Sequence, residues 1–188
     1  MNKSLIALAL TSMISVSAFA GDNYKIDPRH TFPSFEINHL GYSIQRGRFN
    51  HTSGNVELDT AAKQGKIDIT IDATSISTGL PDLEKHLQGE DFFDTEKYPT
   101  ITFTSTKLKF DGDKLVGAEG NFTMHGVTKP VSLQIDHFKC APNPMTKVPT
   151  CGANATTTIK RTDFGISKYA PALGDEVKIA IQVEANKT

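Results

Sequence analysis

The sequence predicts a mainly β domain, an antiparallel barrel or a sandwich, with one short helical segment. Eight or nine segments alternate apolar and polar residues at hairpin spacing, which is typical of antiparallel strands with one face in water. Turn sequences such as Asp-Gly-Asp-Lys at 111–114 separate these segments. Only residues 80–87 repeat apolar side chains at helical spacing. The chain has no internal repeat and no linker, so we expect a single domain.

The first 20 residues predict an export signal. Lys3 supplies the positive start, residues 5–19 are mostly apolar, and residues 18–20 form a small-x-small cleavage site. A membrane anchor is the less favoured alternative, because the apolar run is too short to span a bilayer well and no positive stop follows it. We therefore expect residues 1–20 to be removed and residues 21–188 to form one domain in the periplasm.

Charge and composition make several partners unfavourable. Lys3 is the only charged residue of the signal, so the remaining chain has 19 basic and 21 acidic residues and a net charge near −2. It has no basic stripe interleaved with aromatic residues, which argues against nucleic acid as a partner. An anionic membrane surface would not attract it. The rest of the chain contains no second hydrophobic span, so we do not expect stable insertion into a membrane.

Strand-like alternation recurs along most of the chain. The residues in apolar phase are, in chain order, Phe35, Ile37 and His39; Ile67, Ile69 and Ile71; Leu108 and Phe110; Phe122 and Met124; Val131, Leu133 and Ile135; Ile159; and Val177, Ile179, Ile181 and Val183. One face of each strand is polar, so one face of the sheet contacts water.

A short helix and an aromatic loop interrupt the strands. Leu83 and Leu87 lie at helical spacing, with acidic residues early, basic residues late and Gly89 as a stop, which fits the helix dipole. Phe92 and Phe93 follow in a connecting segment, where leaving them in water would cost roughly 1.5–3 kcal/mol each. They must cover apolar surface, and we expect this segment to form a lid over a pocket.

The two cysteines, Cys140 and Cys151, predict one structural disulfide, because the export signal implies an oxidising compartment. A redox-active or metal-binding thiol pair is the alternative, but ten residues separate the cysteines and no histidine lies between them. We expect the bridge to hold a proline-containing hairpin away from the ligand site.

The interior of the predicted barrel has two alternative states. An eight-stranded barrel is just wide enough to fill itself with side chains or to hold one slender ligand. The inward residues are Ile, Leu, Val and Phe, with no Trp and few Tyr, which suits a hydrocarbon. Periodicity alone does not separate a cavity from a packed core, although the aromatic lid favours a cavity.

Several segments of the chain resemble those of a known family. The segments that carry the resemblance occur in family order: YKIDPRH at 24–30, FEINHLGYS at 35–43, GRF at 47–49, SISTG at 75–79, HL at 86–87, DFFDTEKYP at 91–99, MHGVTKPV at 124–131 and RTDFG at 161–165. The chain resembles the YceI-like family of periplasmic, lipocalin-like polyisoprenoid-binding proteins. The resemblance implies an extended eight-stranded antiparallel barrel, a helical segment at one end, and an apolar tunnel for a polyprenyl chain. The segment bounded by the cysteines departs from the usual pattern.

The resemblance and the alternation together give a candidate ligand-binding set. It comprises Phe35, Ile37, His39, Phe49, Ile69, Leu83, Leu87, Phe92, Phe93, Ile101, Phe103, Phe122, Met124, Ile135, Ile159, Arg161, Phe164 and Ile181. The set contains no catalytic residue and no metal ligand.

Two polar members of this set have alternative roles. His39 is in phase with Phe35 and Ile37 and either satisfies a backbone group or donates to a ligand carbonyl. Arg161 has the parity of an inward residue, and a buried arginine needs a partner. It either pairs with Asp163 to close the barrel end or contacts the polar head of a ligand.

Three classes of function follow. The favoured class is a non-enzymatic carrier of a long isoprenoid lipid, such as the quinone ubiquinone, with no other cofactor and with an inner-membrane redox or lipid-handling protein as a further partner. A redox-associated or quinone-modifying protein is the alternative, but the sequence offers no activated nucleophile, carboxylate dyad or metal site. A packed structural β-domain is the third. We expect a monomer or a homodimer.

Overall fold

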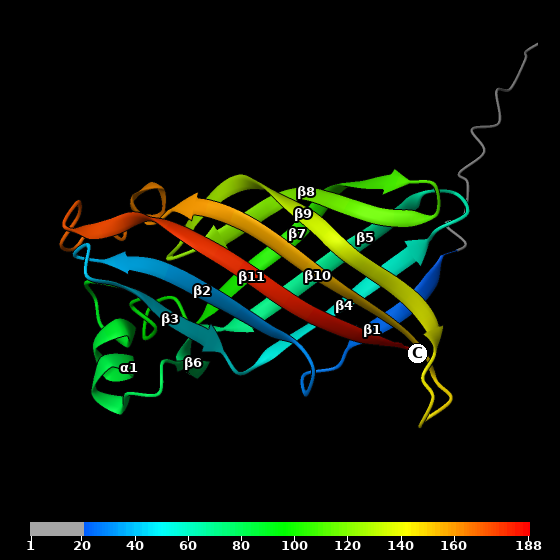
Figure 1. The fold of residues 1–188 in the computed structure, drawn as a ribbon, viewed down its shortest axis with the longest axis horizontal. Coiled ribbons are helices and arrows are strands. Elements are labelled where there is room, and N and C mark those ends of the chain that lie inside the picture. Colours follow the sequence, from blue (N-terminus) through cyan, green and yellow to red (C-terminus); the bar gives the residue numbers. More distant parts are fainter. Residues whose placement is uncertain (1–20) are drawn as a thin grey trace, which may run out of the picture.

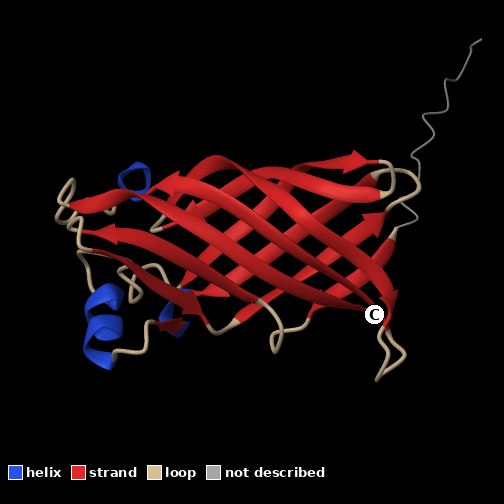
Figure 2. Cartoon of the chain, viewed as in Figure 1, coloured by secondary structure: helices blue, strands red, loops and turns tan. Residues whose placement is uncertain are grey.

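The computed structural model describes residues 21–188 and shows an elongated antiparallel β-barrel with a short helix at one end (Figures 1 and 2). The predicted export signal, residues 1–20, lies outside the described residues. The strands are β1 (Asp22–Ile26), β2 (Phe32–His39), β3 (Ser43–Phe49), β4 (Thr52–Asp59), β5 (Gln64–Asp72), β6 (Ile76–Ser77), β7 (Thr100–Asp111), β8 (Lys114–Met124), β9 (Val127–Pro142), β10 (Pro149–Lys160) and β11 (Leu173–Lys187). The helices are α1 (Pro81–Gln88) and the 3₁₀ helices η1 (Ala73–Ser75) and η2 (Arg161–Phe164).

Eight strands close the barrel, which settles the choice between a barrel and a sandwich. They follow the order β1, β4, β5, β7, β8, β9, β10 and β11, and β11 pairs back with β1. β11 is long enough to pair with β1 near its end and with β2 along residues 173–182. β3 pairs with β2 while β4 pairs with β1, so β1 with β2, and β3 with β4, each act as one interrupted strand.

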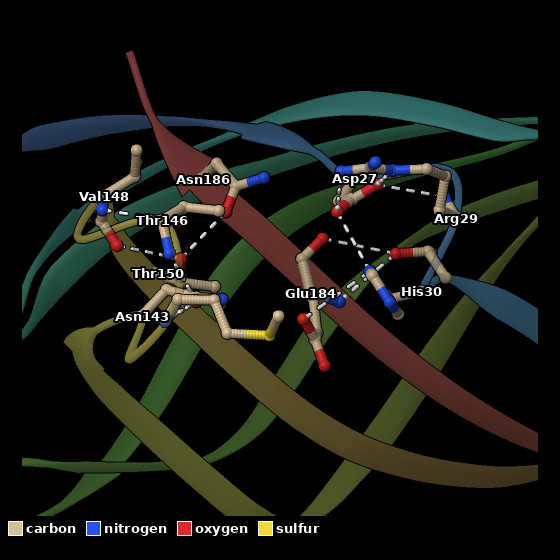
Figure 3. Close-up of polar contacts among 11 residues, drawn as sticks. Asp27, Arg29, His30, Asn143, Thr146, Val148, Thr150, Glu184 and Asn186 are labelled. Atoms are coloured by element: carbon tan, nitrogen blue, oxygen red, sulfur yellow. Dashed lines mark hydrogen bonds and ion pairs between the residues drawn. The ribbon is translucent and has the colours of Figure 1, made fainter.

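The interruption between β1 and β2 is built by Asp27, which is buried. Pro28 lacks an N–H, so the ladder cannot continue there. The Asp27 carboxylate accepts the backbone N–H of Arg29 at 3.0 Å and lies 3.0 Å from Nδ1 of His30 (Figure 3). Burial alone would raise the pKa of Asp27, but the hydrogen bonds from His30 and Arg29 hold it well below its usual range. A charged carboxylate therefore fixes the bend that lets the strand continue along β11.

The interior of the barrel is apolar because successive side chains of each strand point alternately inward and outward. The largest cluster of buried side chains lies toward the helical end and includes Phe49, Ile71, Ile101, Met124 and Ile159. Two smaller clusters, built around Leu58 with Cys151 and around Ile135 with Leu115, lie toward the opposite end.

Two glycines make room for aromatic rings in the barrel wall. The ring of Phe35 lies over Gly47 on the neighbouring strand, and the ring of Phe103 lies over Gly120. A Cβ atom at either glycine would overlap the ring, so these positions exclude larger residues.

The disulfide predicted from the sequence is confirmed. Cys140 on β9 and Cys151 on β10 are directly opposite each other and bonded, with their Cα atoms 4.1 Å apart. The bridge closes the hairpin that projects beyond the barrel at the end opposite α1 (Figure 1).

Candidate functional site

The barrel encloses a cavity of about 940 Å³, which is at the upper end of the usual range for ligand pockets. Side chains of every strand of the closed barrel contribute to its wall, together with α1 and the loops beside it. Most of these side chains are aliphatic or aromatic, and no Asp or Glu is among them. The cavity can therefore hold an apolar chain and offers few hydrogen bonds along its length.

Seventeen of the eighteen predicted residues line this cavity. They are Phe35, Ile37, His39, Phe49, Ile69, Leu83, Leu87, Phe92, Phe93, Ile101, Phe103, Phe122, Met124, Ile135, Ile159, Arg161 and Ile181. Phe164 does not line it. This side chain is almost fully buried behind the wall, with its ring 5.5 Å from that of Phe122, so it supports a lining residue.

Part of the wall was not predicted from the sequence. Thr52 and Leu58 of β4, and Tyr24 of β1, line the cavity, but these strands were not predicted because their polar residues mask the alternation. Ile67 and Ile71 also line it, and their shared phase with Ile69 was the signal that could have identified them.

The two ends of the cavity differ in exposure. At the disulfide end the wall is made by buried residues, among them Tyr24, Leu58 and Cys151. The hairpin of residues 141–150 contributes no side chain to the wall, in keeping with the expectation that it lies away from the ligand site, although Cys151 of the bridge itself belongs to the cavity wall. The exposed lining residues come from the β2–β3 hairpin, α1 and the loop before β11, and these lie together at the other end (Figure 1). The cavity opens at this end, which we call the mouth.

The predicted lid covers the mouth. Pro81 begins α1, and the Glu84 carboxylate accepts the backbone N–H groups of Thr78 at 2.7 Å and Gly79 at 3.0 Å. These bonds hold the pKa of Glu84 below its usual value and fix the helix start. The helix ends at Gly89, as the sequence predicts.

The aromatic pair after the helix packs under the lid. The Phe93 ring lies 5.6 Å from that of Phe49, and the Phe92 ring lies 4.9 Å from that of His86. Phe92 also approaches Tyr169 of the loop before β11 at 6.4 Å, and Lys168 of the same loop pairs with Asp91 at 3.0 Å. Two segments far apart in the sequence thus contact each other at the mouth.

Arg161 is buried at the mouth, but its partner is not the one expected. Its guanidinium donates to the carbonyl oxygens of Gly174 at 2.8 Å, Ile166 at 2.9 Å and Leu173 at 3.1 Å. The predicted pair with Asp163 is wrong, because these residues form the 3₁₀ helix η2 and do not share a strand face. Burial lowers the pKa of Arg161. The side chain joins Ile166 of the loop after η2 to the first residues of β11, and it also touches the cavity.

His39 lies at the rim of the mouth, at the last position of β2. Its phase is as predicted, but the strand ends there and the side chain is exposed. Within residues 21–188 its ring makes no hydrogen bond to a backbone group. Its role toward a ligand stays a prediction.

Thr52 is an exception within the apolar wall. It is 3% exposed and lines the cavity, and its Oγ1 is the buried side-chain atom without a hydrogen-bond partner in the described part of the chain.

Residues 21–188 contain no group of three His, Cys, Asp or Glu side chains that could hold a metal ion. No helix within the same residues is long and apolar enough to cross a membrane.

The fold and the cavity together define a closed antiparallel barrel with an internal apolar site of ligand size. The chain belongs to the YceI-like family, whose domain model matches residues 24–185. Protein YceI of Escherichia coli O157:H7 is 38% identical over 188 residues, which cover 98% of this chain and 97% of that protein.

Solved structures share the fold. BcnA of Burkholderia cenocepacia is 25% identical and superposes with a TM-score of 0.72, over 85% of this chain and 98% of its own. A polyisoprenoid binding domain from Saccharophagus degradans superposes with a TM-score of 0.65 at 17% identity, over 88% of this chain and 98% of its own. The second likeness supports the fold alone.

Proposed function

We propose that this protein binds one long isoprenoid lipid, such as an isoprenoid quinone, and carries it through the periplasm without modifying it. The observation that carries the proposal is the apolar cavity of about 940 Å³ that runs from the mouth to the disulfide end. A flexible hydrocarbon chain gains about 0.8 kcal/mol for each methylene removed from water, so an elongated apolar cavity suits it. A polyisoprenoid binding domain has the same fold, so a barrel of this kind is compatible with such a ligand.

In this proposal, burial of the lipid tail provides most of the binding affinity, and contacts to the lipid head group determine only the orientation of the ligand. The polar residues of the mouth, His39 and Arg161 among them, lie where the head group of a lipid would stay when its tail fills the barrel. Ordering of the tail and immobilisation of the ligand offset much of the gain from burial, so affinity stays below the practical ceiling of roughly 20 kcal/mol.

The proposal is tested by purifying the protein from the periplasm under native conditions and identifying its bound lipid by organic extraction and mass spectrometry. We expect an isoprenoid lipid at one equivalent per chain. Phe103→Asp, which places a charge in the wall, should abolish lipid retention. Thr104→Asp, on the exposed face of the same strand, is the matched control and should leave retention unchanged. Equal retention by both variants would refute binding in the cavity.

A further inference from the structure

Large hydrophobic side chains that are exposed gather around the mouth. Eight such residues are present within residues 21–188, and five of them belong to the mouth. We call these five the mouth rim: Leu40, Tyr42 and Ile44 of the β2–β3 hairpin, Leu80 at the start of α1, and Tyr169 of the loop before β11. Figure 1 places the three segments at the same end of the barrel.

The mouth rim is continuous with the interior of the barrel. Leu40 and Tyr169 are 48% and 56% exposed and also line the cavity, so apolar surface extends from the outside into the tunnel. Tyr42 is 89% exposed at the tip of the hairpin and contributes nothing to the cavity wall. Exposing so many large apolar side chains in one place is unfavourable in water, and such patches mark interaction sites.

We propose that the mouth rim docks onto the surface of a lipid bilayer while a ligand enters or leaves the barrel. This inference rests on the proposed function, because an isoprenoid lipid resides in a membrane and its apolar tail would otherwise have to cross water. Tyrosine is suited to the headgroup region, since its ring is apolar and its hydroxyl can hydrogen-bond to water and lipid headgroups. Leu40, Ile44 and Leu80 then bury their side chains at the boundary of the acyl chains.

The charges near the mouth select the kind of bilayer. The lid segment carries six acidic residues, Asp82, Glu84, Glu90, Asp91, Asp94 and Glu96, against Lys85 and Lys97. The basic side chains Arg46 and Lys168 at the mouth are each paired with a carboxylate, so they leave this acidic excess in place. An anionic surface would repel this segment. Docking is therefore apolar in origin, favours zwitterionic lipid, and depends little on salt.

The test measures uptake of menaquinone-4 from phosphatidylcholine vesicles by lipid-free protein. If docking is required, the uptake rate rises with vesicle concentration and is insensitive to salt. The double variant Tyr42→Ser/Ile44→Ser should lower this rate by about tenfold or more, since each buried side chain is worth more than the ~1.4 kcal/mol that equals a factor of ten. Neither residue lines the cavity, so affinity for detergent-dispersed menaquinone-4 should not change.

Met145 provides the matched control. It is as exposed as Tyr42, at 89%, but lies on the β9–β10 hairpin at the opposite end. Met145→Ser should leave uptake unchanged. An equal rate for wild type and the double variant, or a rate independent of vesicle concentration, would overturn the proposal. A wild-type dimer that becomes a monomer in the double variant would also overturn it, because a second copy would then cover the rim. Failure to bind detergent-dispersed menaquinone-4 would instead refute the proposed function.

Discussion

Two threonines of the interior differ in a way that gives a residue-scale prediction. Thr52 Oγ1 has no partner, whereas Thr31 Oγ1 donates to the carbonyl of Glu184 and accepts its N–H, both at 3.2 Å. Thr52→Val, which keeps the shape and removes an unsatisfied hydroxyl, should leave the free energy of unfolding unchanged or raise it by about 1 kcal/mol. Thr31→Val should lower it by about 1–3 kcal/mol, because the backbone N–H of Glu184 loses its acceptor, whereas the Glu184 carbonyl keeps the N–H of Asp27. Urea unfolding measures both, and equal losses would contradict this account.

Arg161 gives a second prediction at this scale. Arg161→Met removes the donor to three carbonyl groups, one of them fully buried and two partly buried, and a buried acceptor without a partner costs about 1–3 kcal/mol. We expect a fall of about 3 kcal/mol or more in the free energy of unfolding by urea. Asp163→Asn should change stability by less than about 0.5 kcal/mol, because Asp163 is exposed and its carboxylate does not bond Arg161. A larger loss of stability for Asp163→Asn than for Arg161→Met would contradict this account and support the ion pair between Arg161 and Asp163 that was predicted from the sequence.

At the scale of elements, the lid predicts a kinetic effect. Phe92 and Phe93 line the cavity beneath α1, so Phe92→Ala/Phe93→Ala should shorten the residence time of a bound isoprenoid more than it lowers the melting temperature. Val116→Ala, an apolar truncation at an exposed site outside the cavity, controls for general effects of side-chain loss. Stopped-flow displacement measures the off-rate. An unchanged off-rate with a large fall in melting temperature would make the pair part of the core and not a gate.

The disulfide gives a second prediction for an element. Replacing Cys140 and Cys151 by Ser should lower the free energy of unfolding by about 2–4 kcal/mol, because the bridge closes a loop in the unfolded chain. Cys151 lies in the wall at the closed end, so binding of long isoprenoids should weaken more than binding of short ones. Denaturant unfolding and ligand titration measure the two effects. Equal weakening for all chain lengths would contradict this placement of the bridge.

The sequence predicts an element well where its own alternation defines it. β9 and β11 follow from the phase of Val131 to Ile135 and of Val177 to Val183, and α1 follows from its leucines and Gly89. β3 was missed because Gln, Arg and Gly occupy most of its positions, and its strand conformation depends on pairing with β2. Arg161 lines the cavity as predicted, but its pairing with Asp163 was wrong because a single turn of 3₁₀ helix breaks the parity on which that pairing relied.

At the scale of the whole molecule, closure of the barrel could not be predicted from local patterns. It depends on β11 pairing with both β1 and β2, and this requires the bend that Asp27 fixes between them. The cavity is likewise a property of the closed barrel, because the same inward residues would fill a tighter sheet. Periodicity left open the choice between a barrel and a sandwich and between a cavity and a packed core. The resemblance to the YceI-like family predicted the eight-stranded barrel and its tunnel.

The cavity volume sets an expected limit on tail length. We take the volume of a carbon atom with its hydrogens as ~30 Å³, the volume of a water molecule in the liquid. A cavity of about 940 Å³ then accommodates roughly 30 carbons, or about six isoprene units. Each added unit should therefore strengthen binding until the barrel is full, after which further units would lie outside the mouth and add little.

Binding of the isoprenoid tail inside the barrel can be tested by calorimetric titration of lipid-free protein with isoprenoids of two to ten units that share one head group. The account predicts one site per chain, a negative heat-capacity change on binding, and affinity that rises with chain length and then levels near six units. An affinity independent of chain length would show that the head group governs recognition and would contradict the account, as would the absence of saturable binding for any member of the series.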